Sequence, residues 1–234
     1  MLKELIEFLM EQKSPDQIVV KDRVYYDSAY TPANDPYPEC MDVNNLTGIV
    51  DFIKQKPEEW EDLFIHVIDY NCVRLYQSKN GDFNQRVSIL KGSSRPCNFN
   101  FGRHMDIEDF IIAVNGMFIK TDDRDYALKF VSKIKVDANS KIEDDGISQT
   151  VTARVGSSSL VSDLDIQPIL KLQPFRTFNE IDQPESDFVF RMKLSDNKPY
   201  CSLHECDGEA WKQTAIQSIK DYFKKQEINI PVIA

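Results

Sequence analysis

The sequence predicts an α+β fold with a largely antiparallel sheet and helices packed on it. Apolar residues recur at spacings of three and four in several stretches, which indicates amphipathic helices. Other stretches alternate apolar and polar residues, which indicates strands with one buried face. The alternation is clearest in FVFRMK, where Phe188, Phe190 and Met192 share one face. We expect that face to be core.

The elements follow one another along the chain with recognisable boundary signals. Asn44 or Asn45 is expected to cap the second helix, Asp106 the third and Asp207 the last. Helices are expected over residues 1–13, 46–53, 107–118, 123–134 and 207–223. Strands are expected over residues 18–20, 24–26, 63–69, 72–77, 86–90, 147–155, 166–172, 188–193 and 200–206.

Prolines and the chain's tail add further constraints. Three prolines make residues 30–42 a loop or extended arm. Pro168 favours an edge or a bulge in its strand. The apolar tail 228–234 is expected to pair or pack.

A polar, acidic segment at residues 137–146 is the best candidate for a division of the chain. It separates residues 1–136, with a helix, a β-meander and a helical pair, from residues 147–234, a β-rich half with a C-terminal helix. The alternative is one continuous domain in which 137–146 is a long surface loop.

The composition of the chain limits the classes of function that we expect for it. With 28 basic against 38 acidic residues, the formal net charge is −10, so we expect no general nucleic-acid binding. Residues 1–13 do not read as a secretory leader, and no apolar run is long enough for a bilayer. The five scattered cysteines are expected to be free thiols in a soluble, reduced, cytoplasmic protein.

No motif predicts a catalytic residue, a metal or a cofactor. Phosphate-binding glycine loops, a nucleophile elbow and the His-Glu-x-x-His zinc motif are all missing from the sequence. Cys201, His204 and Cys206 raise the question of zinc, which would need Cys97 and His104 as further ligands. Cys206 with His204 as its base would be a nucleophile whose pKa the following helix lowers. We prefer ordinary strand residues to both.

The loop before residues 188–193 holds the candidate binding residues. These are Arg176, Glu180, Asp182, Glu185 and Arg191. Two guanidinium groups flank a run of carboxylates, and guanidinium binds carboxylate in two-point geometry. We expect both arginines to be held by carboxylates of the loop, with Arg176 buried and Arg191 facing solvent or an interface.

Four strings in the chain resemble an uncharacterised group of tailed-phage and prophage proteins. They are DIEDFII at 106–112, DDGISQ at 144–149, the stretch 174–193, and HECDG at 204–208 before Trp211. The layout of residues 42–234 is also loosely similar to the YfdQ-like prophage family. The resemblance implies a virus or prophage gene expressed in the cytoplasm of a bacterial host.

The expected function is therefore a non-enzymatic phage or prophage accessory protein. It would act by binding and self-assembly, as a homo-oligomer with a possible host or phage protein partner. One alternative is a nucleotide-binding protein or hydrolase that uses the loop carboxylates or the Cys206 region. Another is an accessory protein of phage DNA recombination that uses Lys212, Lys220 and Lys224.

Overall fold

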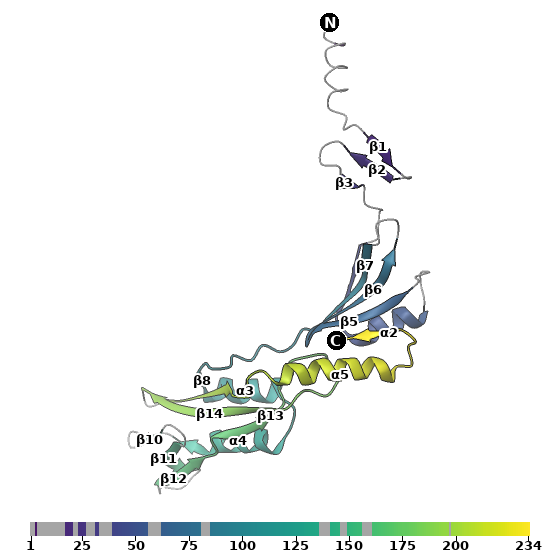
Figure 1. The fold of residues 1–234 in the computed structure, drawn as a ribbon. Helices are drawn as coiled ribbons and strands as arrows, with labels where there is room; N and C mark the ends of the chain where they lie inside the picture. Colours follow the sequence, from purple (N-terminus) through teal and green to yellow (C-terminus); the bar gives the residue numbers. More distant parts are fainter. Residues whose placement is uncertain are drawn as a thin grey trace. The chain divides into compact units, whose positions relative to one another are not determined.

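The structure is a computed structural model, and it confirms the α+β class, with helices packed on mostly antiparallel sheets (Figure 1). It describes residues 3, 17–20, 23–26, 31–32, 39–55, 62–80, 85–135, 141–145, 149–155, 161–196 and 198–234. The chain forms two compact units, Met1–Glu39 with Lys79–Val87, and Cys40–Ser78 with Ser88–Ala234. Segment 137–146 falls in the second unit's range, and the proposed division into 1–136 and 147–234 stays a prediction.

The described part of the first unit contains a small antiparallel sheet. Its strands are β1 (Gln17–Val20), β2 (Arg23–Tyr26) and β3 (Thr31–Pro32), in that order. The β1–β2 hairpin pairs Val20 with Arg23, which confirms the two short strands predicted here. The predicted helix at 1–13, apart from residue 3, and most of the arm at 30–42 lie outside the described residues.

The first sheet of the second unit has the order β16-β5-β6-β7-β4. The strands are β4 (Met41–Val43), β5 (Leu63–Asp69), β6 (Cys72–Asn80), β7 (Gln85–Ser93) and β16 (Val232–Ile233), and the ends of β6 and β7 extend into the first unit. The β5–β6 pair is antiparallel, whereas β16 and β4 lie parallel to their neighbours. The tail thus pairs with β5, as expected.

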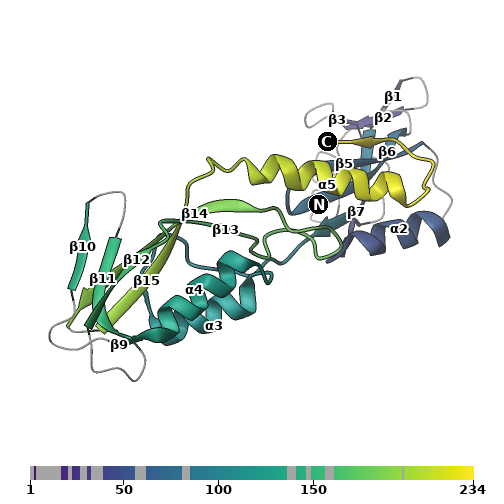
Figure 2. The same cartoon turned by 90° about the horizontal axis from the view of Figure 1, so that it is seen from below.

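Helices α2 (Leu46–Gln55) and α5 (Trp211–Lys225) cover one face of this sheet (Figure 2). The α2 spacing buries Leu46, Ile49, Val50 and Ile53 against β5 and β6, because residues three and four apart share a helix face. Asn45 is the cap: its Oδ1 accepts a hydrogen bond from Gly48 N at 2.8 Å.

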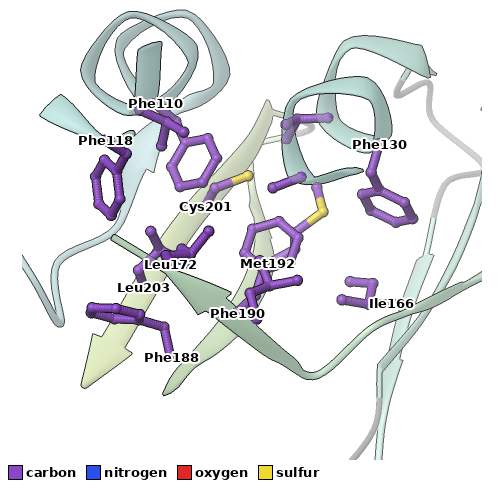
Figure 3. Close-up of a cluster of buried hydrophobic side chains, with 14 of the residues drawn as sticks. Phe110, Phe118, Phe130, Ile166, Leu172, Phe188, Phe190, Met192, Cys201 and Leu203 are labelled. Atoms are coloured by element: carbon purple, nitrogen blue, oxygen red, sulfur yellow. The ribbon is translucent and has the colours of Figure 1, made fainter. Parts of the chain in front are cut away.

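The second sheet of this unit has the order β13-β14-β15-β8 and is antiparallel. Its strands are β13 (Ile169–Leu172), β14 (Ser186–Ser195), β15 (Lys198–Glu205) and β8 (Met105–Asp106). Helices α3 (Ile107–Met117) and α4 (Asp122–Lys133) pack on one face of it. Figure 3 shows the core between them, in which Phe188, Phe190 and Met192 are at most 2% exposed, as the alternation predicts.

The caps of these helices agree with the sequence at α3 and differ at α5. Asp106 accepts a hydrogen bond from Asp109 N at 2.8 Å, as predicted. The Asp207 side chain instead accepts from Glu209 N at 3.1 Å, and α5 begins only at Trp211. The prediction that Asp207 caps α5 is therefore wrong: it caps the turn that precedes the helix.

A further small sheet packs beside β14. It contains β9 (Ile134–Lys135), β10 (Lys141–Asp144), β11 (Gln149–Val155) and β12 (Val161–Ile166). The sequence predicted β11 but neither β10 nor β12. The buried Gln149 side chain anchors this sheet, because its amide donates to Met192 O and accepts from Met192 N.

The predicted single strand over 166–172 is wrong: Pro168 lies between β12, which ends at Ile166, and β13, which begins at Ile169 in another sheet. Strand β13 is the edge strand of its sheet. Two side chains of α4 accept hydrogen bonds from backbone N–H groups along that edge. Tyr126 Oη accepts from Gln167 N at 3.0 Å, and Asp123 Oδ2 accepts from Lys171 N at 2.7 Å. Edge strands with unpaired N–H groups can pair with other chains, so these two contacts protect the edge.

Candidate functional site

Arg176 is the centre of a buried cluster in the second unit. It is 5% exposed. Its guanidinium donates hydrogen bonds to Glu205 Oε1 at 2.7 Å, Ser186 Oγ at 2.6 Å and Pro184 O at 3.2 Å. Its Cζ also lies 3.9 Å from the centroid of the Trp211 ring. We call Arg176, Gln183, Ser186, Glu205 and Trp211 the arginine clamp.

The arginine clamp joins elements that belong to the two cores of the second unit. Ser186 begins β14 and Glu205 ends β15, both in the second sheet, whereas Trp211 begins α5, which packs on the first sheet. Burial lowers the pKa of the Arg176 guanidinium from its ordinary value, and Glu205 opposes that effect. The group stays a cation because arginine does not deprotonate in proteins.

Gln183 braces the loop that carries Arg176. It is 4% exposed. Its Oε1 accepts from Arg176 N at 2.8 Å and from Thr177 N at 3.2 Å, while its Nε2 donates to Phe178 O at 2.9 Å. Buried backbone N–H groups must find partners, so one amide side chain fixes the path of the loop. Thr177 Oγ1 donates in turn to the Tyr70 carbonyl oxygen.

The predicted burial of Arg176 is confirmed, but its predicted partners are wrong. The ion pair is to Glu205, at the end of β15, and not to a carboxylate of the loop. Within the loop, Asp182 and Glu185 are exposed, and neither contacts the clamp in the described structure. The reason is that Gln183 and Pro184 fill the inner side of the turn, which leaves its carboxylates outside.

The Glu180 side chain caps the N-terminus of helix α2. Its Oε1 accepts from Leu46 N at 2.7 Å and from Thr47 N at 3.2 Å. These are the first two N–H groups of α2, which have no partner inside the helix and lie at the positive end of its dipole. Glu180 therefore completes the cap that Asn45 begins.

Arg191 faces away from the core, as predicted, and its ion pair is to Asp144 of β10. The Nη1–Oδ1 distance is 3.6 Å, and the Arg191 side chain is 21% exposed. This contact links β14 to the small sheet and again involves no carboxylate of the loop at 180–187. Neither of the two predicted binding arginines is therefore paired with a carboxylate of the loop.

Two of the predicted residues line a pocket of about 290 Å³ between the loop and α5. The lining residues are Glu180, Ile181, Asp182, Ser218, Asp221, Tyr222 and Lys225. Three carboxylates face one lysine, so the pocket repels phosphate groups. This geometry gives no support to nucleotide binding by the loop carboxylates.

Two of the α5 lysines proposed for DNA contact are engaged with carboxylates. Lys212 Nζ lies 2.7 Å from Glu209 Oε2, and Lys224 Nζ lies 3.2 Å from Asp221 Oδ1. Glu209 raises the pKa of Lys212 through this hydrogen bond. Paired lysines offer less attraction to a phosphate backbone than isolated ones.

The cysteines are all free. Burial raises the pKa of the Cys201 thiol to about 12. Burial, and then Asp187 and Asp207, also raise the pKa of Cys206. The expectation of a lowered pKa at Cys206 is wrong, because a turn separates it from the start of α5 while two carboxylates lie close.

His104, Ser202 and His204 form a polar cluster on the face of the second sheet opposite the core. The Ser202 Oγ lies 3.0 Å from His204 Nε2 and 3.4 Å from His104 Nε2. Burial, Lys193 and His204 lower the pKa of His104. Although serine beside histidine resembles a nucleophile and its base, Ser202 is 0% exposed, which closes it to a substrate.

The face of the first sheet opposite α2 and α5 carries aromatic and cationic side chains. Phe64 and Tyr76 are paired across β5 and β6 and stack with centroids 5.4 Å apart. His66 and Arg74 form the next outward-facing pair, and Ile233 of β16 pairs with His66. A hydrogen bond with Tyr76 raises the pKa of Arg74. We call Phe64, His66, Arg74, Tyr76 and Ile233 the aromatic face.

Sequence reasoning missed all four other members of the arginine clamp as partners of Arg176: Gln183, Ser186, Glu205 and Trp211. Gln183 carried a weak signal, as a neutral amide inside an otherwise acidic loop. Glu205 carried a stronger signal. The strand alternation places it on the same face as Cys201 and on the other face from His204 and Cys206.

The chain has no match among protein-family models, curated proteins or solved structures. Among the described residues, no helix combines the length and apolar character needed to cross a membrane. The same residues contain no group of three or more metal-ligating side chains arranged around one point.

Proposed function

We propose that this chain is a non-enzymatic accessory protein of a phage or prophage, and that it acts by binding and self-assembly through the aromatic face. The observation that carries the proposal is the composition of that face. It presents aromatic rings, one guanidinium and an apolar edge residue, and no carboxylate. Centres of protein interfaces are enriched in aromatic residues and arginine and depleted in aspartate and glutamate.

Charge limits where a second copy of the chain could bind. Each chain carries a net charge of −10, so two copies repel one another across most of their surfaces. None of the five residues of the aromatic face is acidic, so these residues add nothing to that repulsion. In a two-fold arrangement each contact occurs twice, so any contact of Arg74 with an aromatic ring of the other copy would be made twice.

The matched pair Tyr76→Ala and Tyr200→Ala tests this proposal. Both tyrosines are half-buried strand residues, but Tyr200 lies in the second sheet, away from the aromatic face. Sedimentation velocity over a range of concentrations should show a wild-type dimer that Tyr76→Ala dissociates and Tyr200→Ala preserves. A monomeric wild-type protein, or equal effects of the two variants, would contradict the proposal.

The phage setting and the bacterial cytoplasm rest on the four strings that resemble tailed-phage and prophage proteins. Transcript measurements before and after prophage induction test them, and we expect the gene to rise together with its phage neighbours. An unchanged transcript level would argue against this setting without bearing on the dimer.

A further inference from the structure

We propose that His104 and His204 form a two-imidazole site for a divalent ion of the late transition series, such as Ni²⁺, Cu²⁺ or Zn²⁺. The chain has only three histidines, and two of them meet although they lie far apart in the sequence. Their Nε2 atoms lie 3.4 and 3.0 Å from one hydroxyl oxygen, that of Ser202. The proposal does not depend on self-assembly, and it revises the expectation of no metal.

Backbone pairing places both imidazoles on the same face. Strand β15 pairs Cys201 with Met105 of β8, so the next position along this antiparallel register sets His104 opposite Ser202. His204 is two residues beyond Ser202 on β15, and residues two apart in a strand point to the same side. The two imidazoles are therefore diagonal neighbours across adjacent chain segments.

The segment before His104 is fixed to β15 by its main chain. Gly102 N donates to Leu203 O at 2.8 Å. Gly102 has φ of 74°, a conformation that glycine adopts without strain. In addition, Phe101 stacks on Phe188 with centroids 5.1 Å apart, which anchors the segment in the core. His204 thus lies on strand β15, and His104 follows a turn that is hydrogen-bonded to that strand.

The chemistry of the cluster suits a borderline-soft ion. Zinc–imidazole bonds are about 2.0–2.1 Å long, and imidazole also suits nickel and copper. The ring planes are inclined at 73° with centroids 6.4 Å apart, so an ion between the Nε2 atoms requires the rings to turn toward one another. Histidine χ2 torsions are broad, and His104 is exposed and free to make that adjustment.

The neighbouring groups define what kind of site this is. Ser202 is fully buried, so its hydroxyl does not act as a nucleophile. It is a hydrogen-bond partner of both imidazoles, and the rings give up that contact when they turn toward an ion. Lys193 lies close enough to His104 to act on it electrostatically, and its positive charge also repels a cation. We infer a site of modest affinity, with water in the remaining coordination positions and room for a ligand from outside the chain.

Isothermal titration with Ni²⁺ tests the site. The full chain is first freed of metal with a chelator, and its accessible thiols are alkylated with N-ethylmaleimide so that cysteine does not compete. We expect one saturable Ni²⁺ site per chain at pH 7.5. His104→Gln and His204→Gln should each abolish saturable binding, whereas Asp51→Asn, an exposed change on α2, should leave it unchanged.

Folding of each variant is checked by its circular dichroism spectrum and thermal melt without metal. Because His104 is exposed, His104→Gln tests the site even if His204→Gln lowers stability. Saturable binding that survives His104→Gln would overturn the proposal. So would the absence of binding to the wild-type chain, or an equal loss in Asp51→Asn.

Discussion

Replacing Arg176 with lysine should destabilise the protein far more than the same change at Arg191. Lysine keeps the positive charge of Arg176 but loses the planar fork that reaches Glu205, Ser186 and the Pro184 carbonyl together. It also loses the stack on Trp211 at 3.9 Å. The contrast between the two variants separates the arginine clamp from a surface ion pair.

The magnitude follows from the contacts that disappear. Two lost hydrogen bonds to a charged donor cost about 1.5 kcal/mol each at the lower limit. The lost cation–π contact, being desolvated, is worth about 2 kcal/mol. Because 30% of the Glu205 side chain is exposed, water relieves part of its lost pairing. We therefore expect about 3–5 kcal/mol, which corresponds to a fall in Tm of about 6–20 °C in a chain of this size.

The comparison with Arg191→Lys makes the prediction refutable. Arg191 is 21% exposed and its partner Asp144 is 45% exposed, so the pair contributes about 0–1 kcal/mol. Urea denaturation followed by circular dichroism measures both changes in the free energy of unfolding. If Arg176→Lys stays within about 1 kcal/mol of wild type, the clamp does not hold the two cores together and the reasoning fails.

Three other outcomes are expected. Gln183→Leu should lower the free energy of unfolding by about 2–4 kcal/mol in urea titrations, because it leaves two buried N–H groups without acceptors; an effect near zero would mean that water replaces the amide. Cys201, with a thiol pKa of about 12, should resist alkylation in the native protein and react only in denaturant, as mass spectrometry would show; native labelling at neutral pH would contradict its burial. Asp187→Asn should lower the pKa of Cys206 and speed its alkylation at pH 8, since it removes a nearby negative charge; an unchanged rate would remove Asp187 as a cause.

Local patterns predicted the elements well where one face is buried. The alternation at 188–193 and the spacing of Leu46, Ile49, Val50 and Ile53 identify residues that are buried in the structure. Strand β12 was missed because its sequence, VSDLDI, is short and half acidic or polar, and its place depends on pairing with β11. Such a segment becomes a strand through its neighbour rather than through its own preference.

The partners of charged residues were harder to predict than the elements. Arg176 and Glu205 are 29 positions apart, and the four carboxylates of the loop lie closer to Arg176 in the sequence. Proximity along the chain favoured those four, but the fold exposes Asp182 and Glu185 and places Glu180 at the start of α2. It brings the end of β15 to Arg176 instead. Burial settles the choice, because a buried guanidinium requires a counter-charge on its own side of the loop.

A double-mutant cycle between Arg176 and Glu205 can test whether charge or stacking carries the clamp. Glu205→Gln keeps an oxygen acceptor but removes the counter-charge, which leaves the guanidinium buried beside Pro184 and Trp211. We expect a coupling energy of about 1.5–3 kcal/mol between Arg176→Lys and Glu205→Gln, since the two groups touch at 2.7 Å. A coupling below about 0.5 kcal/mol, together with a large loss in Trp211→Leu, would assign the stability to the stack on Trp211 instead. In that case Glu205 would serve only to orient a guanidinium that the aromatic ring already holds.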